Sequence, residues 1–229
     1  MTPRGSIASF AAALVVAGSV LGIAACGEDE AEQPASGTTV SEGGPDAPAC
    51  EEVAPAEPKK VKLEKPSEPV KPKERIVATV ETNCGDFQID LDTKGSPKTT
   101  GSFVHMVDEG LYGDTPFHRV VDGFVIQGGD PAADGTGGPG YSVTEEPGPN
   151  VAYTHGVVAM AKSGVEPAGT SGSQFFVVTG ADAGLPPDYA VLGELTGDEA
   201  AVDAIEAQAG SGDGPPVAPV VIERITLER

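Results

Sequence analysis

Large apolar side chains are almost absent between residues 27 and 75 of this chain, where Pro recurs from Pro34 to Pro72. The stretch has no apolar period of 2 or 3.6 residues, so it offers no face that could pack against a core. We therefore predict that residues 26–75 are a disordered tether rich in Pro, Lys and Glu. The hydrophobic core must come from residues 76–229, which have the length of one domain.

The N-terminal segment has the features of an export signal. Arg4 precedes an apolar run from Ile7 to Ile23 that is interrupted only by Ser, Gly and Ala. The run ends in Ile23-Ala24-Ala25-Cys26, which resembles the lipobox of bacterial lipoproteins. The resemblance implies that residues 1–25 are a signal peptide and that Cys26 carries acyl chains such as palmitate. An uncleaved membrane anchor and an ordinary signal peptide are the alternatives.

An acylated Cys26 would attach the protein stably to a bilayer, because two or more acyl chains bind far more firmly than one. We therefore expect a lipid-anchored protein on the extracytoplasmic face of the cell membrane. Half of the 14 basic residues lie between Lys59 and Arg75. They could contact anionic wall polymer or lipid headgroups, but interleaved Glu residues favour a solvated spacer.

The region 76–229 is strongly acidic. The whole chain has a formal net charge of −21. The basic residues of this region are only Lys94, Lys98, Arg119, Lys162, Arg224 and Arg229. Phosphate binding requires the opposite charge, which excludes nucleic acid as a partner.

Short runs with alternating apolar residues predict β-strands separated by Gly- and Pro-rich turns. These runs include residues 76–80, 87–91, 157–160 and 220–227. Two stretches predict helices: one begins at Ser96-Pro97 and repeats apolar residues at Phe103, Val107 and Leu111, and the other spans residues 198–208. An all-β barrel closed by two helices is the simplest architecture.

Two motifs carry the chemistry. The segment from Pro116 to Asp130 contains Phe-His-Arg, then Gly-Phe, then Gln-Gly-Gly-Asp. It resembles the first signature of cyclophilins. Residues 159–162 and 172–177, Ala-Met-Ala-Lys and Gly-Ser-Gln-Phe-Phe-Val, resemble the second signature in the correct order. This similarity covers residues 76–229 and implies a closed eight-stranded antiparallel β-barrel capped by two α-helices, with peptidyl-prolyl cis-trans isomerase activity.

The resemblance also implies the site. Arg119 would donate a hydrogen bond to the prolyl nitrogen, and Gln127 would orient its guanidinium as the second catalytic residue. The implied substrate-binding residues are Phe124, Val125, Ala161, Lys162, Gln174, Phe176, Leu185 and Tyr189. Rotation about an X-Pro bond breaks only amide resonance, against a barrier of ~18–20 kcal/mol, so it requires no nucleophile and no cofactor.

The site departs from the usual family pattern at four positions. Val125 stands where many members have Met, Lys162 where Asn is usual and Tyr189 where many have His. Gly184 stands where many have Trp and removes an aromatic wall. We therefore expect activity, with weaker binding of cyclosporin.

Several other features carry no separate function. His118 is interpreted as a packed neighbour of Arg119, and His105 and His155 belong to no metal-ligand pattern. The Gly-rich run at residues 135–140 lacks a preceding strand and a following helix, so it is a loop and no dinucleotide site.

We expect a monomer whose partners are proline-containing segments of exported proteins. A non-catalytic peptide-binding holdase that uses the same groove is the principal alternative, and a purely structural lipoprotein is another.

Two further cysteines remain, Cys50 in the tether and Cys84 in the predicted turn of the first hairpin. An even pair outside the cytoplasm favours a disulfide, which would fix the tether against the barrel. Free thiols or a bond between two molecules remain alternatives, because a disordered tether has no fixed geometry.

Overall fold

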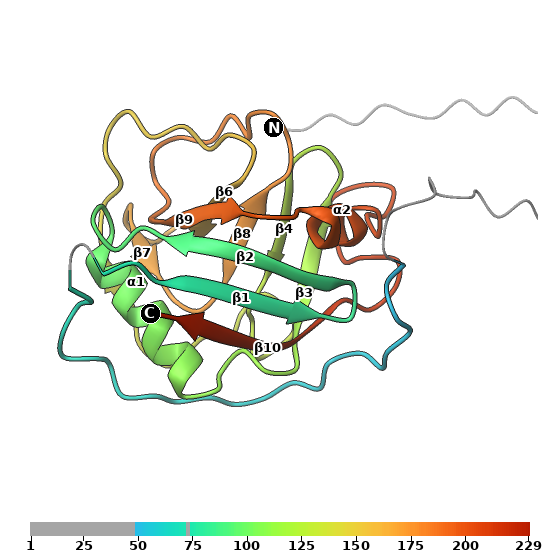
Figure 1. Ribbon diagram of the computed structural model, residues 1–229, viewed down its shortest axis with the longest axis horizontal. Helices are drawn as coiled ribbons and strands as arrows, with labels where there is room; N and C mark the ends of the chain where they lie inside the picture. Colours follow the sequence, from blue (N-terminus) through green and yellow to red (C-terminus); the bar gives the residue numbers. More distant parts are fainter. Residues whose placement is uncertain (1–48, 72–73) are drawn as a thin grey trace, which may run out of the picture. The chain divides into compact units, whose positions relative to one another are not determined.

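Eight strands form a closed antiparallel barrel in the order β1-β10-β3-β4-β8-β6-β9-β2. Figure 1 labels these strands on the ribbon. The structure is a computed structural model, and it describes residues 49–71 and 74–229. Two short strands, β5 and β7, pair separately, and two helices complete the element set of the described residues. The predicted eight-stranded barrel with two helices is confirmed.

The strands of the barrel are β1 (Val77–Thr82), β2 (Gly85–Leu91), β3 (Thr115–Val121), β4 (Val125–Gly128), β6 (Val157–Met160), β8 (Phe175–Val178), β9 (Val191–Thr196) and β10 (Val221–Glu228). The separate pair is β5 (Val143–Thr144) and β7 (Thr170–Ser171), and the helices are α1 (Pro97–Asp108) and α2 (Ala200–Glu206). The four predicted strands correspond to β1, β2, β6 and β10 within one to two residues at each end.

Both helices begin near the positions that the sequence predicts. Pro97 occupies the first turn of α1, where its missing N–H would have no helical partner. Phe103 and Met106 are fully buried, whereas the predicted apolar position Leu111 lies beyond the end of α1 and is still buried. Helix α2 is shorter than predicted, and it contacts β2, β3 and β4.

Alternation along the strands divides the core into two clusters. Successive side chains of a strand point to opposite faces. In β8, Phe175 and Val177 face the barrel interior, whereas Phe176 and Val178 belong to a second cluster outside it. Both faces of β8 are therefore buried, which explains its continuous apolar run. The second cluster forms the floor of the candidate site.

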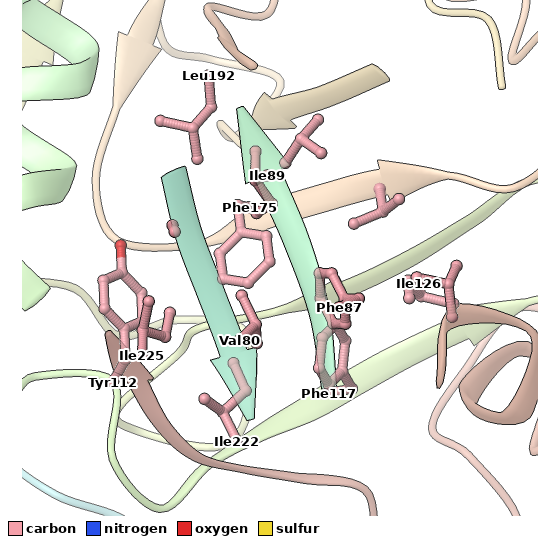
Figure 2. Close-up of a cluster of buried hydrophobic side chains, with 14 of the residues drawn as sticks. Val80, Phe87, Ile89, Tyr112, Phe117, Ile126, Phe175, Leu192, Ile222 and Ile225 are labelled. Atoms are coloured by element: carbon pink, nitrogen blue, oxygen red, sulfur yellow. The ribbon is translucent and has the colours of Figure 1, made fainter. Parts of the chain in front are cut away.

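The ring of Phe175 lies at the centre of the interior cluster, as Figure 2 shows. It makes edge-on contacts with Tyr112 and Phe117, with ring centroids 6.0 and 6.1 Å apart. The Tyr112 hydroxyl donates a hydrogen bond of 3.0 Å to the Ser173 carbonyl, and burial raises the Tyr112 pKa well above its ordinary value. The interior thus fixes the segment that carries Gln174 and Phe176.

Residues 49–71 differ from the disordered tether that the sequence predicts. This segment, which we call the strap, follows the outside of the barrel in an extended path (Figure 1). Its backbone N–H groups at Glu51, Lys59 and Leu63 donate hydrogen bonds of 2.6–2.8 Å to carbonyls of the turn after β1 and of the loop 131–139. Val61 and Leu63 pack against the interior cluster. The strap forms no hydrophobic core of its own, and its apolar side chains pack against the core of the barrel.

A disulfide joins Cys50 to Cys84 at the start of the strap. Cys84 is buried and Cys50 packs beside α2, where its sulfur lies 3.6 Å from the Ala204 carbonyl. At the other end, the Val70 N–H donates to the Pro97 carbonyl at the start of α1. The strap is therefore attached at both of its ends.

The predicted signal peptide and the lipidated Cys26 lie outside the described residues. Within residues 49–71 and 74–229, no helix is long and apolar enough to cross a bilayer.

Candidate active site

Arg119 and Gln127 are direct partners in the pairing of β3 with β4. The register shifts between Phe117 and Arg119, which is the mark of a β-bulge. The Arg119 Nη1 donates a hydrogen bond of 3.3 Å to the Gln127 Oε1. Two motif residues eight positions apart therefore act as one polar unit.

The orientation of the Gln127 amide is fixed by its other partners. Its Nε2 donates to the Gln174 Oε1 at 3.1 Å and lies 3.3 Å from the His118 Nε2. Burial lowers the pKa of His118, so its imidazole is neutral at neutral pH and its Nε2 accepts the second amide hydrogen. Gln174 in turn donates to the Gly135 and Gly137 carbonyls. His118 is thus more than the packed neighbour that the sequence predicts.

Nine of the ten predicted catalytic and substrate-binding residues line one cavity of about 180 Å³. They are Arg119, Phe124, Val125, Gln127, Ala161, Lys162, Phe176, Leu185 and Tyr189. The tenth, Gln174, lines an adjoining cavity of about 540 Å³ that shares Gln127, Ala161 and Lys162. The two cavities together make a groove with an apolar end and a polar end.

Aromatic rings form one wall of the apolar end. Phe176 and Tyr189 contact each other edge to face, with centroids 5.5 Å apart. The position of Tyr189 is set by Tyr153, whose hydroxyl donates to the Tyr189 carbonyl at 2.6 Å and accepts from the Tyr189 N–H at 2.9 Å. Sequence reasoning missed Tyr153, because no local pattern links residues 36 positions apart.

The rim of the groove shows the departures from the family pattern. Gly184 has a positive φ of 62°, which disfavours a side chain there, and no described atom lies within 4 Å of the position that a Cβ would take, so the site has no aromatic wall at this residue. The Lys162 Nζ lies 5.5 Å from the centre of the Tyr189 ring, which is a cation–π distance. The same ammonium group donates to the carbonyls of Ser163 and Glu166.

Arg119 supplies a cationic side chain to the groove. The guanidinium carbon lies 5.5 Å from the centre of the Phe124 ring, and a hydrogen bond to Asp213 raises the Arg119 pKa. The side chain therefore stays charged, and it lines the apolar cavity. Such a site can polarise an amide, but it presents no activated nucleophile.

Comparison with known proteins identifies this arrangement. Residues 77–227 match the family described as "Cyclophilin type peptidyl-prolyl cis-trans isomerase/CLD". The chain is 38% identical over 175 residues to "Peptidyl-prolyl cis-trans isomerase B" of Streptomyces anulatus, an alignment that covers 68% of this chain and 98% of that protein. It is also 38% identical over 168 residues to "Peptidyl-prolyl cis-trans isomerase A" of Mycobacterium tuberculosis, with 66% and 91% covered.

A crystal structure of a cyclophilin-type isomerase from Cryptosporidium parvum is similar with a TM-score of 0.63 and 29% identity, over 68% of this chain and 99% of that one. A second structure of that protein, in the presence of the dipeptide Ala-Pro, gives a TM-score of 0.62, with 67% and 99% covered. The barrel, the paired Arg and Gln, and these relatives agree, and the chain belongs to the cyclophilin-type peptidyl-prolyl cis-trans isomerase family.

Proposed function

We propose that this isomerase acts outside the cytoplasm on proline-containing segments of exported proteins, held at the membrane by a lipid on Cys26. The apolar run before Cys26 and the lipobox-like sequence support the anchor. The disulfide between Cys50 and Cys84 supports an oxidising compartment, since such bonds are rare in the cytosol.

The placement of Arg119 in the lining of the apolar cavity carries the proposed mechanism. As the X-Pro bond twists, amide resonance is lost and the lone pair localises on the prolyl nitrogen. A guanidinium N–H can donate to this lone pair, and Gln127 holds the guanidinium in place. The same donor is weaker toward the planar amide, so it stabilises the transition state selectively.

The cavity walls supply the rest of the stabilisation. An acceleration of about 10⁵ requires roughly 7 kcal/mol, whereas one charge-assisted hydrogen bond contributes ~1.5–3 kcal/mol net. Phe176 and Tyr189 form an apolar wall that accepts the proline ring. An apolar surround disfavours the charge-separated planar amide and so lowers the barrier to rotation. The groove beyond Gln127 binds the flanking peptide.

Replacement of Arg119 tests this mechanism. We expect Arg119→Ala to lower turnover of a proline peptide at least tenfold, which corresponds to about 1.4 kcal/mol. Arg224→Ala is the matched control, because Arg224 also pairs with a carboxylate, Glu81, but lies away from the groove residues. Protease-coupled and NMR exchange assays report the rate, and circular dichroism reports the fold.

Equal turnover in Arg119→Ala and wild type would contradict the proposed mechanism. A folded wild-type protein that binds proline peptides without accelerating their isomerisation would favour the holdase alternative.

A further inference from the structure

Asp213 makes the strongest contacts to Arg119 in the described structure, although it belongs to neither motif. Its Oδ1 accepts from the Arg119 Nε at 2.6 Å, and its Oδ2 accepts from Nη2 at 2.7 Å. Two parallel bonds of this kind fix both the position and the plane of a guanidinium. The bond from Gln127 is longer and single, so it fixes the plane less firmly.

The backbone places Asp213 opposite Arg119. Asp213 lies in the loop between α2 and β10, which runs along β3. The Val120 N–H donates to the Gly214 carbonyl at 2.8 Å, and the Phe117 N–H donates to the Val220 carbonyl at 2.9 Å. The backbone next to Arg119 and the backbone next to Asp213 are thus hydrogen-bonded to each other. This pairing holds the two side chains opposite each other, and we call their two-bond contact the fork.

The fork also determines which guanidinium hydrogens stay available. Asp213 occupies the edge formed by Nε and Nη2, and Gln127 accepts one hydrogen of Nη1. This leaves one hydrogen on Nη1 and one on Nη2 without a partner among the described residues. Because Arg119 lines the apolar cavity, these two hydrogens are the donors that a bound peptide can use.

We propose that Asp213 is a positioning residue for Arg119 in proline isomerisation, an inference that rests on the role proposed above for Arg119. Packing alone does not hold the arginine, whose side chain is 30% exposed. The fork, in place of packing, constrains the orientation of the guanidinium. It directs the unpaired hydrogens of Nη1 and Nη2 toward the substrate. A misplacement of about 1 Å can cost about 10²-fold in rate. Because the guanidinium acts on the twisted amide and less on the planar one, this loss falls on kcat more than on KM.

Two other roles for Asp213 give different outcomes. An exposed ion pair with no further role contributes little to stability or to turnover, and Asp213 is 63% exposed. A carboxylate that competes with the substrate for the guanidinium would inhibit, so its removal would raise turnover. The edge-on geometry favours positioning over competition, since it leaves Nη1 and Nη2 hydrogens free.

The test compares Asp213→Asn, Asp213→Ala and Asp213→Glu with the wild type. Asp108→Asn is the matched control, because Asp108 pairs with Arg229 in the same exposed manner. NMR exchange on a proline peptide gives kcat and KM, and the ¹⁵N signal of the Arg119 Nε–H reports the fork directly. We expect kcat to fall about three- to tenfold in the Asn and Ala variants, with KM changed less than about twofold. Asp213→Glu should recover part of the loss.

The Nε–H signal should be sharp in wild type and exchange-broadened in Asp213→Asn, with the same urea midpoint for both. Unchanged or raised kcat in Asp213→Ala, or an equal loss in Asp108→Asn, would overturn the proposal. An Arg119→Ala variant with full turnover would instead refute the role of Arg119. In that case the Nε–H signal would still show whether Asp213 holds the guanidinium.

Discussion

Removal of the disulfide between Cys50 and Cys84 should lower the free energy of unfolding of the whole domain. The size of this effect follows from the length of the loop that the disulfide closes. The two cysteines are 34 residues apart in sequence. In the chain-entropy treatment, a loop of this length restricts the unfolded state by about 3–4 kcal/mol. Because a domain of this kind is stable by roughly 5–15 kcal/mol, the loss is a large fraction of the total.

The substitutions should respect the surroundings of each sulfur. Cys84 is 1% exposed, so Cys84→Ala avoids a buried hydroxyl without a partner, and Cys50→Ser suits the half-buried partner. The chain contains no Trp, so far-UV circular dichroism in urea is the preferred signal. We expect the free energy of unfolding to fall by about 3–4 kcal/mol relative to the oxidised wild type.

Reduced wild type is the control, and it should match the double variant. A difference of less than about 1 kcal/mol between oxidised wild type and the double variant would refute the entropic reasoning. It would mean that the unfolded chain already keeps the strap near the hairpin.

Three further predictions concern pH, inhibitor and anchor. Burial lowers the His118 pKa, so turnover should stay constant above about pH 6.5 and fall as acid protonates His118, because its Nε2 then no longer accepts from Gln127. The free energy of unfolding should also decline below that pH, since the unfolded state binds the proton first. NMR exchange measures the turnover and urea titrations measure the stability, with His105→Gln as the control. A turnover that stays constant down to pH 4.5 would contradict the role given to His118. In a calorimetric titration cyclosporin should bind this domain more weakly than it binds a family member that carries Trp at the position of Gly184, and tight stoichiometric binding to this domain would contradict this. If Cys26 is lipidated as proposed, Cys26→Ser should abolish the sedimentation of the protein with membranes. A correctly cut form of this variant that still sediments with membranes would contradict the anchor.

The barrel and most of the groove could be predicted because their signals are local. Strand periodicity identifies β1, β2, β6 and β10, and nine of the ten predicted site residues line one cavity. The family resemblance carried the site assignment, since no local rule gives a role to Leu185 or Ala161.

The cysteine pair predicted that the tether is fixed against the barrel, but the packing of the strap and the contact of Asp213 with Arg119 could not be predicted, for one physical reason. Val61 and Leu63 are too few to form an apolar face of their own, and they become half-buried only because the barrel surface completes their packing. Asp213 meets Arg119 across 94 residues of chain, through a loop that carries no motif. Contacts made by tertiary structure alone leave no pattern in the sequence.

The disulfide also sets the mechanical behaviour of the molecule. Tension that reaches Cys50 from the N-terminal side passes through the sulfur–sulfur bond into Cys84, in the turn between β1 and β2. The strap lies between the two bridged cysteines, so the disulfide bypasses it and the strap carries none of the force. The load falls on a hairpin that is held on both edges, by β10 and β9, so its strands resist together. In the reduced protein the same pull would peel the strap away one hydrogen bond at a time. Oxidation thus moves the load from the hydrogen bonds of the strap, which would open one at a time, to a hairpin whose two strands are both paired to further strands.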